Sequence, residues 1–165
     1  MKALFKALIV AILITAPVMA LDAGIKVFSN YVESVGIGGG AGVFGQFPIT
    51  KHIVFYPGID ILYVSDKGSD LEHQVISLDI PLNFKMWYEI INGLKMYAGA
   101  GIAPQVYASK WVPSDNEKFS PKTDFGADAF IGFDFLIGSK TIMLELQQGM
   151  ITEYNATKFC IGFIF

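Results

Sequence analysis

Apolar and polar residues alternate along much of the chain, most regularly in residues 75–88, which read VISLDIPLNFKMWY. One set of alternate positions is apolar: Ile76, Leu78, Ile80, Leu82, Phe84, Met86 and Tyr88. The other set is mixed and mostly polar: Ser77, Asp79, Pro81, Asn83, Lys85 and Trp87. A period of two is that of an extended strand with two unlike faces. The pattern predicts a strand but leaves open whether its apolar face meets a protein core or lipid.

The same alternation recurs in seven further segments. They are residues 23–32, 41–49, 53–64, 96–108, 125–137, 142–150 and 158–165. Together with residues 75–88 they make eight strands, and no segment has a convincing helical period. The sequence therefore predicts an all-β fold, an eight-stranded antiparallel up-and-down barrel.

The segments between these strands differ in length. The second, fourth and sixth links, residues 50–52, 89–95 and 138–141, are tight, whereas residues 65–73 and 112–124 are longer and polar. Short turns at one end and longer loops at the other are typical of outer-membrane barrels. The first and seventh links are also short, so the asymmetry is moderate. An even number of strands brings both termini to the short-turn end.

Residues 1–20 have the layout of a secretory signal peptide. Lys2 and Lys6 precede an apolar run over residues 7–16, and Pro17 leads to the small-residue site that ends at Ala20. The alternative is a single transmembrane anchor, but the run is shorter than the roughly 20 apolar residues that a span needs. We expect cleavage after Ala20, which leaves one barrel domain over residues 21–165.

Charge and cysteine content narrow the function classes. The chain has 12 basic residues, all lysine, and 15 acidic ones; without Lys2 and Lys6 the balance is near −5. The absence of arginine and of a basic patch argues against nucleic-acid binding. The single cysteine, Cys160, cannot form an internal disulfide.

Composition indicates which face meets which solvent. The apolar face is nearly free of charge on every strand. The opposite face carries eight charged residues: Lys26, Asp60, Asp79, Lys85, Asp128, Asp134, Glu145 and Lys158. It also carries bulky aromatics separated by glycines: Phe28, Phe44, Tyr56, Trp87, Tyr97 and Phe130. Eight strands enclose an interior just wide enough for side chains, and paired charges are tolerable there. We therefore expect a side-chain-filled lumen and a lipid-facing exterior.

The whole segment after residue 20 resembles the small eight-stranded outer-membrane β-barrel proteins, a family that includes outer membrane protein X and the transmembrane domain of outer membrane protein A. The resemblance lies in the strands SLDIPLNFKMWY and KMYAGAGIAPQVY and in the final FCIGFIF. It implies a location in the bacterial outer membrane. It also implies that Phe165, with Phe163 and Ile161 on the same face, is read by the barrel-assembly machinery, after delivery by periplasmic chaperones. We expect a monomer in lipid.

Candidate chemistry is sparse. His52 and His73 are expected near opposite barrel ends with no third ligand, so we expect no metal, and no cofactor motif stands in a suitable context. Neither histidine has a serine and an acid matched to it as a catalytic triad would need. We expect a non-enzymatic barrel with a structural or surface-interaction role, through loops near residues 66–72 and 113–123. Two alternatives stay open: a lipid-modifying outer-membrane enzyme and a secreted soluble carrier of the lipocalin type.

Overall fold

The computed structural model describes residues 22–33, 35–66, 72–112, 120–150 and 155–165. The predicted signal peptide and its cleavage site lie outside these residues. The tips of two of the expected loops also lie outside them.

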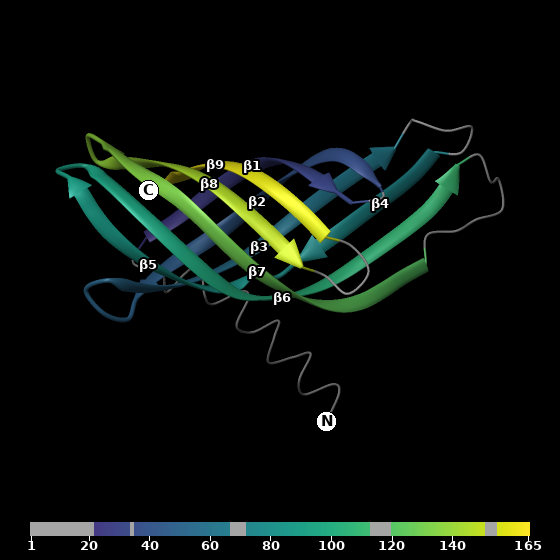
Figure 1. Cartoon of the computed structure of the whole chain (residues 1–165), viewed down its shortest axis with the longest axis horizontal. Coiled ribbons are helices and arrows are strands. Elements are labelled where there is room, and N and C mark those ends of the chain that lie inside the picture. Colours follow the sequence, from purple (N-terminus) through teal and green to yellow (C-terminus); the bar gives the residue numbers. More distant parts are fainter. Residues whose placement is uncertain (1–21, 34, 67–71, 113–119, 151–154) are drawn as a thin grey trace, which may run out of the picture.

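Nine strand segments form one closed antiparallel sheet (Figure 1). They are β1 (Asp22–Val32), β2 (Gly36–Pro48), β3 (Ile53–Asp66), β4 (Glu72–Asp79), β5 (Leu82–Ile91), β6 (Leu94–Val112), β7 (Ser120–Ile137), β8 (Lys140–Met150) and β9 (Asn155–Ile164). The β1–β9 and β2–β3 pairings complete the ring. Because β4 and β5 both pair with β3 and with β6, they are two halves of one barrel strand. The predicted eight-stranded barrel is confirmed.

The interruption between β4 and β5 corrects the prediction of one unbroken strand over residues 75–88. The Ile80 amide donates to the Pro104 carbonyl at 2.8 Å, and the Gly58 amide donates to the Pro81 carbonyl at 2.9 Å. Directly opposed antiparallel residues normally exchange two such bonds. Proline has no N–H, so the reciprocal bonds from Pro104 and Pro81 cannot form. Inside–outside alternation nevertheless continues through the break, with Asp79 and Pro81 buried.

The two ends of the barrel differ. One end of the barrel, which we call the turn end, is closed by the short connections 49–52, 92–93 and 138–139. The start of β1 and the end of β9 also lie there, since the Phe165 amide donates to the Ala23 carbonyl at 2.9 Å. Gly93 and Gly138 have φ values of 85° and 63°, a left-handed conformation that two-residue hairpin turns favour. The other ends of these strands, among them Val32, Asp66, Val112 and Met150, lie at the opposite end, which we call the loop end (Figure 1).

The outer and inner faces follow the sequence pattern. In β1, residues from Gly24 onward alternate strictly between buried and exposed. Outward side chains are apolar and open, for example Ile61 and Ile131, each 60% exposed, whereas the buried set mixes aromatic, aliphatic and charged groups. The core of the molecule is therefore the barrel lumen. Among the described residues, no helix is long and apolar enough to cross a membrane.

Strands β6 and β7 extend well beyond the segments that the sequence predicted for them. β6 and β7 pair from Ser109 and Ser120 down to the turn end, but β7 meets β8 only from Ala127 onward. The β6–β7 hairpin therefore extends past β8 at the loop end (Figure 1). Polar residues such as Thr123 and Asp124 break the alternation there, which is why the sequence placed them in a link. At the other side of the sheet, β2 begins at Gly36, inside the expected first link.

Candidate functional site

All eight charged residues that the sequence assigned to the lumen are buried inside the barrel. They come from seven strand segments, β1, β3, β4, β5, β7, β8 and β9, and each lies on the inward parity of its strand. Burial of this kind requires partners, because an isolated charge in a low-dielectric interior costs several kcal/mol.

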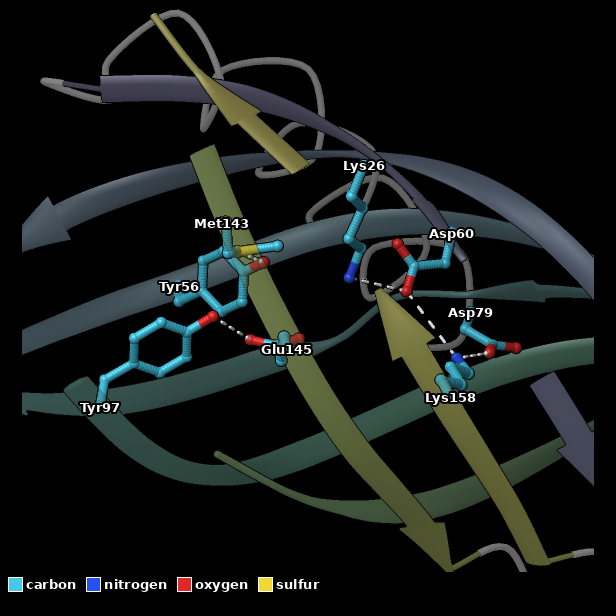
Figure 2. Close-up of polar contacts among 8 residues, drawn as sticks. All are labelled: Lys26, Tyr56, Asp60, Asp79, Tyr97, Met143, Glu145 and Lys158. Carbon is cyan, nitrogen blue, oxygen red and sulfur yellow. Dashed lines mark hydrogen bonds and ion pairs between the residues drawn. The ribbon is translucent and has the colours of Figure 1, made fainter. Parts of the chain in front are cut away.

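Four of these residues form one connected cluster (Figure 2). Lys26 lies 3.0 Å from Asp60, and Lys158 lies 2.9 Å from Asp79 and 3.8 Å from the same Asp60 oxygen. The Ser77 hydroxyl donates to Asp79, and its oxygen lies 3.3 Å from that of the Gln105 side chain. Lys158 on β9 thereby joins two carboxylates on β3 and β4, across the lumen.

A second group of contacts involves Lys85, Asp134 and Glu145. The Lys85 ammonium donates to Asp134 Oδ2 at 3.2 Å and lies 4.4 Å from the Tyr97 ring centroid. The Tyr97 hydroxyl donates to Glu145 at 3.1 Å (Figure 2). Charge-assisted hydrogen bonds and cation–π contacts are both stronger in a water-poor interior. Lys85 is therefore held by a carboxylate and an aromatic face together.

The lumen carries more negative than positive groups. Five buried carboxylates, from Asp60, Asp79, Asp128, Asp134 and Glu145, face three buried ammonium groups. Among the described residues, neither Asp128 nor Glu145 has a lysine nitrogen within 4.0 Å. A small cavity of about 30 Å³ lies beside Asp128, Asp79 and Lys158, which is room for about one or two water molecules.

Glycines make room for the aromatic side chains. Phe44 lies over Gly24 and Phe28 over Gly40, each pair directly opposed on β1 and β2. A side-chain carbon at either glycine would overlap the facing ring. Tyr56 packs edge-on against Phe44 with ring centroids 4.9 Å apart. Backbone and ring thus interlock between neighbouring strands on the inner face of the barrel.

Trp87 occupies a different place from the other lumen aromatics. It is half-buried at the turn end, where it contacts the His52 ring at a centroid distance of 5.6 Å and the Lys95 ammonium at 4.2 Å. A pocket of about 280 Å³ opens beside it. The alternation of residues 82–88 gives the inward parity of Trp87, but its place at the mouth of the lumen depends on barrel geometry.

The proposed assembly residues lie on the outside. Phe165, Phe163 and Ile161 are all exposed, and the Lys140 ammonium lies 5.1 Å from the Phe165 ring centroid. Their place on the apolar face agrees with the sequence pattern. Their part in assembly stays a prediction.

Reactive groups are few in the described part of the chain. Cys160 is fully buried as a free thiol between β1 and β8. The described residues contain no group of three or more His, Cys, Asp or Glu placed to hold a metal ion. The His73 side chain lies outside the described set, although its backbone pairs with Asp66 and Trp111.

The neutral members of the lumen network were not among the predicted site residues, although the alternation placed them on the inward face. Ser77, Gln105 and Gln147 are buried inward-facing polar residues, and Ser77 and Gln105 extend the Asp79 cluster. Their parity along strands was a readable signal. Which carboxylate they contact was not readable, because it depends on pairing between strands distant in sequence.

No protein-family model and no curated protein sequence matches the chain. Three solved structures illustrate the structural likeness. Neisserial surface protein A superimposes with a TM-score of 0.66 at 11% identity, over 87% of this chain and 94% of that one. The attachment invasion locus protein Ail of Yersinia pestis, in complex with the heparin analogue sucrose octasulfate, gives 0.60 at 9% identity, over 89% and 100%.

The outer membrane enzyme PagL gives a TM-score of 0.58 at 14% identity, over 86% of this chain and 98% of that one. The three similar structures include a surface protein, an attachment protein and an enzyme. The chain therefore has the fold of small outer-membrane β-barrels, as the sequence predicted, while the fold by itself does not choose between their functions.

Proposed function

We propose that the protein is an integral outer-membrane β-barrel without enzymatic activity, whose closed lumen carries no open pore and whose role is structural or surface interaction. The observation that carries this proposal is the filled interior, where buried ion pairs and interlocked rings occupy the space between the strands. The turn end would face the periplasm and the loop end the exterior. The barrel would be a monomer in lipid.

The contrast between the two faces supports a membrane setting over a soluble carrier. A carrier of the lipocalin type needs an apolar cavity, but this interior holds eight charged side chains. The apolar side chains instead point outward, with Tyr31 and Tyr63 near the loop end and Tyr88 near the turn end. Aromatic residues at both margins of an apolar band are typical of membrane barrels.

The alternative of a lipid-modifying enzyme finds little support in the described residues. PagL is named as an outer membrane enzyme, and its fold is similar. Here, however, the described contacts of the His52 side chain are to the Trp87 ring, with no serine or acid bonded to it. The carboxylates of the lumen are packed against lysines and rings, and the cavities described beside them, of about 30 and 280 Å³, are too small for a lipid with several acyl chains.

The projecting β6–β7 hairpin is the part best placed for surface interaction. Seven residues of β7, from Ser120 to Gly126, precede its first contact with β8, about 23 Å of strand at the usual rise per residue. Pro121 and Lys122 stand on this free edge, which discourages pairing with another strand. The protein as a whole has a net negative charge and no arginine, which disfavours the binding of polyanions such as the sulfated sugar bound to Ail. A neutral or basic partner fits better.

Lipid-vesicle measurements test this proposal. Protein refolded into vesicles of phospholipid and lipopolysaccharide should release no acyl chain and transfer none, by mass spectrometry of the lipids. In planar bilayers it should give no stable conductance step. Folding is checked by the mobility shift on boiling in SDS that closed barrels show. Lipid turnover by folded protein would replace the proposal with the enzymatic alternative, and a reproducible large conductance would mean a water-filled lumen.

A further inference from the structure

We propose that the turn end of the lumen is a binding site for a small alkyl diamine, a ligand with a primary ammonium group at each end of a short hydrocarbon chain. We call this pocket the vestibule. Its volume is about 280 Å³, and it is lined by residues of seven strands and one turn, among them Asp22, Gln46, Trp87, Glu89, Lys95 and Asp134.

The floor of the vestibule has unused hydrogen-bonding capacity. Lys85 bonds one carboxylate oxygen of Asp134, at 3.2 Å, while the other oxygen, Oδ1, is buried and has no hydrogen-bond partner among the described residues. Asp134 is only 8% exposed. Buried polar atoms without partners are costly, so a ligand that supplies a donor to Asp134 gains that energy.

The charge of the lining selects a cation. Three carboxylates line the vestibule, from Asp22, Glu89 and Asp134, while Lys95 is the lining lysine and Lys85 pairs with Asp134 from the lumen side. Asp134 is buried at the floor, whereas Asp22 and Glu89 are exposed at the rim. Trp87, Leu136 and Ile164 supply apolar surface within the same lining. A short alkyl diamine matches this arrangement: one ammonium would meet Asp134 at the floor, the methylenes would contact the apolar wall, and the other ammonium would meet the carboxylates at the rim.

The protein's own Lys95 shows that an alkylammonium fits beside this wall. Its nitrogen lies 4.2 Å from the Trp87 ring centroid, a cation–π contact. Its backbone is paired with Glu89 on one side and with Asp134 on the other. Lys95 is half-buried, so it can turn outward. Lys95 therefore competes with the diamine for this wall. Removing its ammonium should strengthen diamine binding, whereas removing a carboxylate should weaken it.

Trp87 provides a direct reporter. The chain has two tryptophans, and in a Trp111→Phe variant Trp87 is the only one. Folded protein in detergent is titrated with 1,4-diaminobutane at constant ionic strength, with 1,4-butanediol as the uncharged control. We expect a saturable change in Trp87 fluorescence with the diamine and none with the diol. Asp134→Asn should weaken binding about tenfold or more, since a hydrogen bond to a charged group is lost.

Two further variants separate specific binding from bulk charge. Lys95→Gln should tighten binding by about threefold, because the competing ammonium is removed. Glu33→Gln, at the loop end, removes the same charge as Asp134→Asn far from the vestibule and should leave the affinity unchanged. Glu89→Gln, at the exposed rim, should weaken binding by about threefold and serves if Asp134→Asn fails to fold.

The proposal is overturned by any of three results. The first is the absence of a saturable signal. The second is an equal fluorescence response to the diol, which would mean that the ammonium groups are not recognised, or to sodium chloride at the same ionic strength, which would make the effect one of ionic strength. The third is unchanged affinity in Asp134→Asn, or in Glu89→Gln where the former does not fold. Loss of binding would leave the filled-barrel proposal untouched, because that rests on conductance and lipid turnover.

Discussion

The ring of Phe130 on β7 lies over Gly99, the residue directly opposite it on β6, and a side-chain carbon at residue 99 would overlap the ring. Two residues further along the same pair of strands the arrangement is reversed, with Tyr97 on β6 over Gly132 on β7. Large and absent side chains therefore alternate between neighbouring strands, which lets rings reach across a narrow lumen.

This relationship makes Gly99→Ala destabilising. The added methyl must displace the Phe130 ring or the backbone, and overpacking of this kind costs about 1–3 kcal/mol. Urea titration in lipid vesicles measures the change in the free energy of unfolding. Gly149→Ala is the control, since its nearest neighbour is an Asp128 oxygen at 3.2 Å rather than a ring. The new carbon would also lie 2.5 Å from the Phe84 carbonyl oxygen, so in a Phe130→Ala background the cost should fall without vanishing; an undiminished cost would mean that the ring is not the cause.

Lys158→Met tests the buried ion-pair cluster and should lower the free energy of unfolding strongly. It leaves Asp79 without its lysine and removes one of the two cations near Asp60, and breaking a buried pair in this way costs about 3–5 kcal/mol. Lys122→Met, at the exposed loop end, should cost less than about 1 kcal/mol. Equal costs for the two variants, by the same urea titration, would contradict a tightly packed ionic lumen.

Replacing the proline opposite Ile80 should restore the missing backbone hydrogen bond at the break between β4 and β5. In Pro104→Ala the new N–H faces the Ile80 carbonyl, to which proline cannot donate. The added hydrogen bond, worth about 0.5–1.5 kcal/mol, is partly offset by the freer unfolded chain. Stability should therefore change little, while NMR hydrogen exchange in micelles shows a protected amide at residue 104. Rapid exchange at that amide would mean that the strands are not paired there as described.

The outer face should resist charge only where it meets lipid. Ile131, 60% exposed on β7, lies between two paired strands, and Ile131→Lys should cost about 2–4 kcal/mol near mid-membrane. Thr123→Lys, on the projecting part of the same strand, should be near neutral. Vesicle urea titrations compare the two. A tolerated lysine at residue 131 would place that residue outside the apolar layer.

The sequence predicted the two faces because the period of a strand is two residues, so parity alone assigns Lys26, Asp79 and Ile131 to a side. Parity could not predict that Lys158 meets Asp79, because that contact joins β9 to β4 across the lumen and depends on strand tilt and closure. Pro81 within the segment was a readable sign of a weakened strand. The missing bond at Ile80 could not be predicted, because it arises from Pro104, distant in sequence, which stands opposite Ile80. The vestibule likewise requires the ends of several strands to be brought together.

The central claim, an apolar exterior in lipid around a filled lumen, is tested most directly by spin-label accessibility in vesicles. In a Cys160→Ala background, a nitroxide is placed at residue 131 or at residue 122 of the projecting hairpin, and collision rates with dissolved oxygen and with a water-soluble nickel complex are measured. The account predicts that the label at 131 meets oxygen and is shielded from nickel, with the reverse at 122. A label at 131 that is open to nickel, or shielded from oxygen in protein that stays monomeric without detergent, would contradict it.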